Sequence, residues 1–243
     1  MNKFLFLILF SFSCTLLKAQ NNTDSLFAIW KDETRTDSIR ATAFVQYIQD
    51  SILDNYPDSA FMLAESLLTF GQEKQAPGII ADGYFIQGQS LFSQKNYPEA
   101  LIPYQGSLKI KEEIGDKKGM LKLQTQIAHL YYWQGDYAKS LTYYQSSLEL
   151  CQAIGSQKEL SELLSQIGVV YYVQSNFLTA IDYYQRSLKI KETIGDKLGI
   201  ARSFFLFGHI YYEQKDYEQA LEYYYRSLAI QQEMDDKTEL QHH

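Results

Sequence analysis

Residues 161–200 read SELLSQIGVVYYVQSNFLTAIDYYQRSLKIKETIGDKLGI, and near-copies of this stretch recur when it is shifted by 40 residues in either direction. Gly88, Gly168 and Gly208 occupy one position of the repeat, with Ala128 in the remaining copy. A fixed period of this length is typical of solenoid proteins, in which each repeat packs on its neighbours. Other recurring positions hold Tyr131, Tyr171 and Tyr211; Ala100, Ala180 and Ala220; and Tyr104, Tyr144, Tyr184 and Tyr224.

Each repeat has two halves, and both have the apolar spacing of a helix. The first half covers residues 160–173 and the second covers residues 177–194. Between them lies a polar turn whose Asn176 can cap the second helix. Gly195 is expected to end that helix, because glycine tolerates the left-handed conformation. Gly168 and Ala180 are expected at the closest crossing of the two helices, where a large side chain would push them apart.

The pattern resembles the tetratricopeptide repeat family, in its long 40-residue variety, over about four-fifths of the chain. The resemblance implies an all-α fold, a right-handed superhelical solenoid of antiparallel helix hairpins with about five repeats. A degenerate first copy contains Phe44, Tyr47 and Ala60. The regular copies match the family at Tyr84, Gly88, Leu91, Ala100, Tyr104 and Ser107; at Gln124, Ile127, Ala128, Tyr131, Ser140, Tyr144 and Ser147; at Leu164, Ile167, Gly168, Tyr171, Ala180, Tyr184 and Ser187; and at Phe204, Phe207, Gly208, Tyr211, Ala220, Tyr224 and Ser227.

The expected organisation has three parts. Residues 1–19 form a signal peptide, and residues 20–36 form an N-terminal capping helix and linker. The apolar stripe of that helix is Leu26, Phe27 and Trp30, which would cover the open end of the solenoid. The repeat array occupies residues 37–240, with repeats at about 37–78, 79–118, 119–158, 159–198 and 199–238.

The first residues are typical of an exported protein. Lys3 precedes a short apolar run, and Ala19 provides a small residue before a polar stretch, so cleavage is expected after Ala19. The apolar run is shorter than the roughly 20 residues of a membrane span. Lipoprotein processing and anchoring at Cys14 is an alternative. Both routes deliver the mature chain to the periplasm or cell envelope, with no transmembrane span.

Composition excludes several classes of function. The formal net charge is −7, and no run of Lys or Arg is present, so no nucleic-acid partner is expected. Cleavage of the signal peptide leaves Cys151 as the only thiol, so no internal disulfide, metal cluster or catalytic Cys–His pair is expected. Its sister positions are Lys111, Lys191 and Gln231, and we expect a half-exposed thiol.

No catalytic constellation emerges from the sequence, and no enzyme, cofactor or metal site is predicted. Residues 115–119 read GDKKG, lack the Lys-Ser/Thr pair of a phosphate-binding loop, and recur as residues 195–199, as an inter-repeat turn would. His129 and His209 lie two repeats apart, beyond joint reach of one metal ion. An enzyme would need a polar cluster inside the groove.

The resemblance implies a peptide-binding groove on the concave face, lined by the first helix of each repeat. The clamp that grips carboxylates in some family members needs Lys and Asn there, and only Lys122 and Arg202 come near. The Asn ladder of long-helix relatives is altered, and Val169 interrupts it. The groove residues carried over from the family are Phe85, Gln89, Phe92, Thr125, His129, Tyr132, Ser165, Val169, Tyr172, Phe205, His209 and Tyr212, with Trp133 beside them.

An aromatic strip of Phe92, Tyr132, Tyr172 and Tyr212 remains, and its members could also pack against neighbouring helices. Tyrosine offers a large contact area and a hydroxyl group at modest entropic cost. The sequence therefore predicts a non-enzymatic protein-protein interaction scaffold in the bacterial cell envelope that binds an extended peptide or a partner surface. The alternative is the extracytoplasmic sensory region of a membrane histidine kinase or transcriptional regulator, complete or truncated.

The last expected helix keeps an apolar edge at its C-terminal end. Leu228, Ile230 and Met234 match apolar residues of an interior repeat rather than polar capping residues. This edge predicts either pairing with another copy or with a partner, or a chain that was once longer.

Overall fold

The computed structural model describes residues 25–240. All of its regular structure in that range is helical, without strands, which confirms the predicted all-α fold of helix hairpins. The predicted signal peptide at residues 1–19 and the alternative anchor at Cys14 lie outside the described residues. None of the helices within residues 25–240 is both long and apolar enough to span a bilayer.

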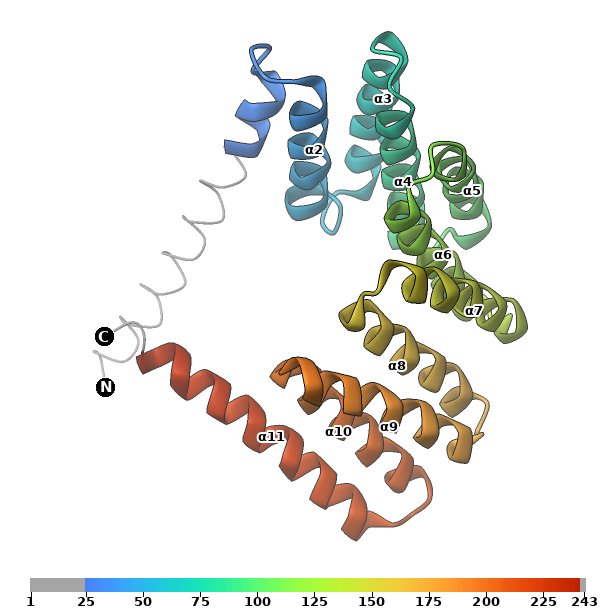
Figure 1. The fold of residues 1–243 in the computed structure, drawn as a ribbon, viewed down its shortest axis with the longest axis vertical. Helices are drawn as coiled ribbons and strands as arrows, with labels where there is room; N and C mark the ends of the chain where they lie inside the picture. The colour runs from blue at the N-terminus through green and yellow to red at the C-terminus, as the bar shows by residue number, and fades with distance from the viewer. Residues whose placement is uncertain (1–24, 241–243) are drawn as a thin grey trace. The chain divides into compact units, whose positions relative to one another are not determined.

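First and second helices of the hairpins alternate along the chain (Figure 1). The first helices begin every 40 residues from α2 onward, and the second helices do so from α3 onward. The first helices are α2 (Asp37–Tyr47), which continues into the π-helical segment η1 (Ile48–Ile52), α4 (Pro77–Ser93), α6 (Lys117–Trp133), α8 (Gln157–Val173) and α10 (Lys197–Glu213). The second helices are α3 (Pro57–Glu73), α5 (Tyr97–Glu113), α7 (Tyr137–Ile154), α9 (Phe177–Ile194) and α11 (Tyr217–Leu240).

Short polar turns define the helix ends, as the sequence predicts. The Asn176 side chain accepts a hydrogen bond from the Thr179 amide at 3.3 Å and so caps the start of α9. Gly195 ends α9 with φ of 71°, in the left-handed region that glycine adopts at little cost. Both details confirm the predicted boundaries of α9.

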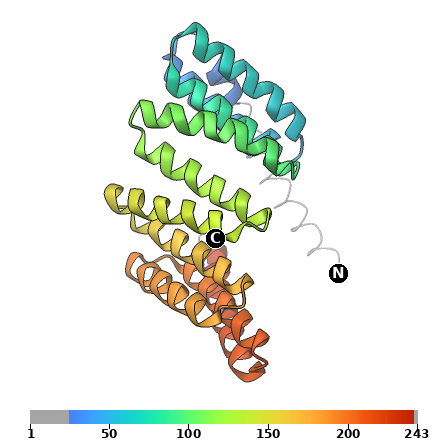
Figure 2. The same ribbon diagram turned by 90° about the vertical axis from the view of Figure 1, so that its right-hand side faces the viewer.

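The chain forms two compact units, divided after Leu123 within α6. In the first unit, α4 packs against both α3 and α5. In the second unit, each helix from α8 to α10 packs against the helix before it and the helix after it. The hairpins of each unit follow one another in sequence order (Figure 2).

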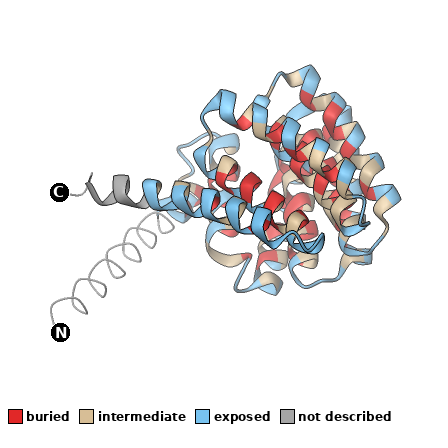
Figure 3. Ribbon diagram, turned by 90° about the horizontal axis from the view of Figure 1, so that it is seen from below, coloured by how far each residue is buried: buried red, intermediate tan, exposed pale blue. Residues whose placement is uncertain are grey.

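Buried residues, coloured red in Figure 3, alternate along the helices with exposed ones. In the second unit, Ala180 and Tyr184 of α9 form one core cluster with three residues of α10. Gly168 lies directly against the ring of Tyr184 and near the carbonyl oxygen of Ala180. The predicted close crossing of α8 and α9 is therefore confirmed. The α10 members of the cluster are Phe204, Phe207 and Ile210.

A helical segment at residues 25–31 precedes α2 in the first unit. Trp30 is buried and stacks on Phe44 of α2, with ring centroids 4.4 Å apart. Arg40 donates a hydrogen bond from Nε to the Trp30 carbonyl oxygen at 3.0 Å. Leu26 is also buried, whereas Phe27 remains 37% exposed. These contacts attach the segment to the first hairpin.

The α11 helix presents large apolar side chains to solvent. Leu221 and Leu228 are 53% and 46% exposed, whereas their counterparts Ile181 and Leu188 on α9 are partly buried against the core. The difference arises because α10 covers α9, and no further hairpin follows α11 within residues 25–240. Tyr217 and Tyr225 extend this exposed surface.

The sequence-based expectation for Cys151 was wrong. Its side chain is only 1% exposed, and Sγ donates to the Ser156 carbonyl oxygen at 3.2 Å. Lys111 and Lys191, which occupy the same position in other repeats, are buried as well. Long Lys side chains can bury their aliphatic stems, so their presence at this position did not indicate a half-exposed site.

Candidate functional site

Four predicted groove residues surround one hollow in the second unit. Tyr132 of α6, Val169 and Tyr172 of α8, and His209 of α10 line a space of about 190 Å³. These residues come from three successive first helices, as the family resemblance implies. The rest of the wall is formed by Val173, Tyr184 and Leu206.

Each aromatic of the predicted strip packs against the first ring of the helix that follows it. Tyr172 lies 5.9 Å from Phe177 at the start of α9, and Tyr132 lies 5.9 Å from Tyr137 at the start of α7. Such contacts hold the rings in place and reduce the entropy lost when they bind a partner. The same arrangement joins Phe92 to Tyr97 and Tyr212 to Tyr217.

The phenol groups of Tyr132 and Tyr172 in the hollow are neutral near pH 7. Burial, with a further contribution from Tyr137, raises the pKa of Tyr132 above its usual value. Burial, followed by the nearby Glu213 carboxylate, raises the pKa of Tyr172. The phenols therefore remain protonated, and each can both donate and accept a hydrogen bond.

The other predicted groove residues of the second unit differ in accessibility. His129 packs edge-on against Tyr144, with ring centroids 5.8 Å apart, and burial lowers its pKa. Its imidazole is therefore neutral at pH 7. Trp133 and Tyr212 are the most exposed, at 61% and 54%. Phe205 is 49% exposed and meets His209 edge-on at 4.6 Å.

Two predicted groove residues are buried and offer little surface to a ligand. The Lys122 ammonium group lies 4.2 Å from the ring centroid of Phe85 in the first unit. In the second unit, Ser165 Oγ is a hydrogen-bond partner of both Lys191 and Ser187. Thr125 is partly buried, with its hydroxyl 3.5 Å from Ser147 Oγ.

Gln49 in the first unit was not among the predicted groove residues. Its Nε2 donates a hydrogen bond to Oε1 of Gln89 at 2.7 Å, across exactly the distance of one repeat in sequence. Gln49 lies in η1, and π-helical turns are frequent at functional sites. The signal was the 40-residue spacing, which places positions 49 and 89 in one register even though the first repeat is degenerate.

Comparison with known proteins agrees with this geometry. The tetratricopeptide repeat family model matches residues 119–192 and 159–233, which include most of α6 and the whole of α7 to α10. Residues 119–233 are tetratricopeptide repeats. No curated protein matches the chain in sequence.

Solved structures share the fold at low sequence identity. The chain is similar to BtubC (BKLC) from P. vanneervenii, with 18% identity, a TM-score of 0.71 and coverage of 90% of each chain. A Rap protein complexed with competence and sporulation factor has 12% identity and a TM-score of 0.65, covering 83% of this chain and 66% of that one. A Pyrococcus horikoshii signal transduction ATPase with a tetratricopeptide repeat sensor has 18% identity and a TM-score of 0.62, covering 91% of this chain and 36% of that one.

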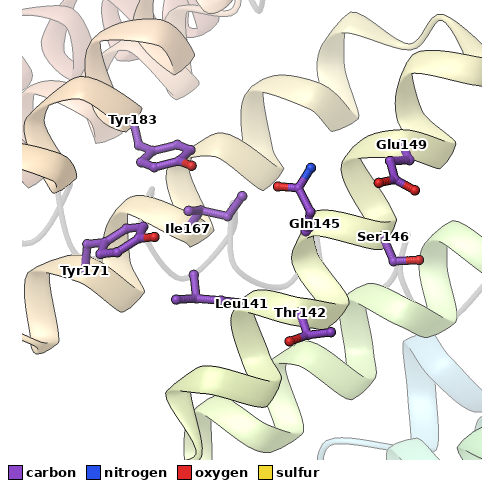
Figure 4. Close-up of a pocket in the computed structure, with 8 residues that line it drawn as sticks. All are labelled: Leu141, Thr142, Gln145, Ser146, Glu149, Ile167, Tyr171 and Tyr183. Carbon is purple, nitrogen blue, oxygen red and sulfur yellow. The ribbon is translucent and has the colours of Figure 1, made fainter.

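The tetratricopeptide repeats contain a second, larger hollow that the sequence analysis did not predict. It has a volume of about 540 Å³ and lies between α7, α8 and α9 (Figure 4). Tyr171 and Tyr183 form one wall and stack with centroids 5.5 Å apart. Equivalent stacked pairs occur in the two neighbouring hairpins, whereas the hairpin of α4 and α5 has Leu91 and Pro103 at these positions. The other pairs are Tyr131 with Tyr143 and Tyr211 with Tyr223.

The residues that line the 190 Å³ hollow are suited to binding a ligand. Within residues 25–240, no group of three His, Cys, Asp or Glu side chains is arranged to hold a metal ion. The 190 Å³ hollow combines the apolar side chains of Val169, Val173 and Leu206 with phenol groups and the imidazole of His209. Such a surface can hold an apolar side chain and form hydrogen bonds to peptide amides.

Proposed function

We propose that this protein is a non-enzymatic interaction scaffold that binds an extended peptide segment of a partner protein. The observation that carries the proposal is the hollow shared by Tyr132, Val169, Tyr172 and His209. Tetratricopeptide repeats support it, because proteins built from them generally act as scaffolds. The similarity in fold to a Rap protein complexed with competence and sporulation factor also supports it.

The hollow suits a peptide that inserts an apolar side chain. Val169 and Leu206 provide an apolar floor, and the phenols of Tyr132 and Tyr172 stand beside it. Val169 occupies the position where related long-helix repeats would place a polar ladder residue. A valine at this position cannot form a side-chain hydrogen bond to the peptide backbone, but its apolar surface can contact an apolar side chain of the peptide. Binding then becomes selective for that peptide side chain.

We further propose that the scaffold works in the bacterial cell envelope. The apolar run before Ala19 supports export, and cleavage there would leave α2–α11 intact. The helix at residues 25–31 would then cap the first hairpin through Trp30. Detection of the mature protein in periplasmic and membrane fractions, with its N-terminus determined by mass spectrometry, tests this assignment. A chain that keeps Met1 and remains in the cytoplasm would contradict it.

The groove can be tested with peptides selected from a random dodecamer phage library against the full chain. We expect Tyr132→Ala combined with Tyr172→Ala to weaken binding of the selected peptides by at least about ten-fold, because central tyrosines often contribute over 1 kcal/mol each. Tyr225→Ala is the matched control, since Tyr225 is 66% exposed on α11. Circular dichroism and thermal melting establish that the variants fold. Unchanged affinity in a folded double variant would refute the groove assignment.

A further inference from the structure

A third hollow of the second unit is lined by charged groups. It has a volume of about 450 Å³ and lies between α8, α9 and α10. Val169 and Leu206 line this hollow and also the 190 Å³ hollow of the proposed peptide groove, so the two spaces adjoin. Its charged lining residues are Lys158, Glu162, Lys191, Asp196 and Arg202.

Lys191 is the buried cation of this hollow. Its side chain is almost inaccessible, and Nζ donates to Ser165 Oγ at 2.9 Å and to Ser203 Oγ at 3.2 Å. An ammonium group has three N–H donors, and Lys191 forms no salt bridge with any residue between 25 and 234. One donor and the full positive charge are therefore left for another group.

The serine hydroxyls around Lys191 are oriented to accept. Ser203 donates its own proton to the Gly199 carbonyl oxygen at 2.9 Å. Ser187 donates to the Ser161 carbonyl oxygen at 2.6 Å, so in the 2.8 Å contact between Ser165 and Ser187 the donor is Ser165. The hydroxyl groups of Ser165 and Ser203 thus present lone pairs to Lys191 Nζ and hold its ammonium group at the wall of the hollow.

Lys111, the equivalent lysine two repeats earlier, has carboxylate partners that Lys191 lacks among the described residues. Lys111 forms salt bridges with Asp82 at 2.9 Å and with Asp116 at 3.1 Å. Burial would lower the pKa of Lys111, but these two carboxylates raise it overall. Glu162 and Asp196 occupy the corresponding positions near Lys191, yet neither forms a salt bridge with it.

We infer that the hollow around Lys191 binds the carboxylate of an acidic side chain in the peptide that occupies the adjoining groove. This inference rests on the proposed function. Lys158 and Arg202 are exposed and can contact the carboxylate as it enters, whereas Lys191 lies at the buried wall of the hollow. Burial lowers the pKa of Lys191 and nearby acidic groups offset this only in part, so a bound carboxylate would restore the environment that Lys111 already has.

The charge balance favours a carboxylate over a phosphate group. Three cationic and two anionic side chains line the hollow, which leaves one net positive charge. A carboxylate carries a single negative charge and neutralises the site, whereas a phosphate monoester carries nearly two charges at pH 7. An acidic Asp or Glu next to the apolar residue of the peptide is therefore the expected signature.

The decisive experiment is a double-mutant cycle with a library-selected peptide that contains Asp or Glu. We expect Lys191→Met, or replacement of the acidic residue by Asn or Gln, to weaken binding at least ten-fold in fluorescence anisotropy. Lys191→Met should have no additional effect on the neutral peptide, because the two changes remove the same contact. Arg202→Gln, at an exposed position, is a second variant should Lys191→Met fail to fold.

Lys111→Met is the matched control, because it makes the same substitution at the same position of another repeat. It should lower the melting temperature by leaving Asp82 and Asp116 without their cation, but should not affect peptide binding. Selected peptides without acidic enrichment, or equal affinity for the neutral peptide, would overturn the inference and leave the groove intact. Tighter binding of a phosphoserine peptide would overturn the choice of carboxylate. Loss of the Tyr132 and Tyr172 effect would instead refute the proposed function.

Discussion

The Cα atom of Gly168 on α8 lies against the ring of Tyr184 on α9, with no space for a methyl group between them. Gly88 has the same relationship with Tyr104. The tyrosine rings are almost fully buried, so they cannot move aside at low cost. This contact sets how closely the two helices of a hairpin approach each other.

Gly168→Ala is expected to destabilise the fold by about 1–3 kcal/mol, because overpacking outweighs the gain in helix propensity of about 1 kcal/mol. Gly106→Ala is the control, since an added Cβ at this α5 position would lie 3.7 Å from Tyr84, an ordinary contact distance. That variant should gain about 0.5–1 kcal/mol. Urea denaturation measures both free energies, and equal effects in the two variants would contradict the packing argument.

Ala180→Leu should also overpack the crossing of α8 and α9. Ala180 is fully buried within the core cluster, and added methylene groups there are expected to cost about 1–3 kcal/mol. Ala138→Leu is the control, because position 138 is exposed and its counterpart in the next repeat is already an exposed Leu178. An Ala180→Leu thermal melting curve that coincides with that of the wild type would refute the assignment.

Tyr104→Phe should leave stability unchanged or increase it by up to about 1 kcal/mol. The Tyr104 hydroxyl is buried and has no hydrogen-bond partner among the described residues, so removing it relieves a desolvation cost. Calorimetric unfolding measures the change, with the exposed Tyr225→Phe as a reference. A clear loss of stability in Tyr104→Phe would show that the hydroxyl does have a partner.

Acidification should destabilise the second unit through His129. Burial lowers the pKa of this imidazole below its usual value of 6.5, so the unfolded chain binds the proton more readily. The contribution of the neutral His129 imidazole to the free energy of unfolding is therefore fully present above about pH 6.5. It decreases as the pH falls toward the folded-state pKa, by at most about 1.4 kcal/mol per pH unit. Melting temperatures between pH 7.5 and 5 should fall further for the wild type than for His129→Gln. Parallel curves would contradict this role.

The sequence predicted the helices well because repetition tests each position several times. The cap at Asn176, the left-handed Gly195 and the crossing at Gly168 each depend on local backbone chemistry and occur where expected. The same comparison did not reveal that Gln49 of the degenerate first repeat lies in a π-helical turn. A π-helical turn forms when backbone hydrogen bonds between residues four apart are replaced by bonds between residues five apart. This replacement leaves no simple periodic pattern in the sequence.

Predictions about the groove were less complete because accessibility depends on the next repeat. Helical register shows which face Phe85 and Ser165 occupy, but not that Lys122 and Lys191 cover them. The burial of Cys151 escaped prediction because Lys111 and Lys191, at the same position of other repeats, suggested an accessible site. A long lysine side chain reaches across the gap between helices and alters which of its neighbours solvent can touch.

Because the helices begin at a constant spacing, the number of repeats can change without altering the residues that line the remaining ones. Deleting residues 157–196 would join Ser156 to Lys197, so that Gly155 and Ser156 would precede α10 in place of Gly195 and Asp196. The new junction would have nearly the same turn as the old one, and α7 would meet a first helix of the same family. Duplication or loss of one such block would therefore change the length of the peptide segment that we propose the repeats bind, while point substitutions would change which segment they prefer.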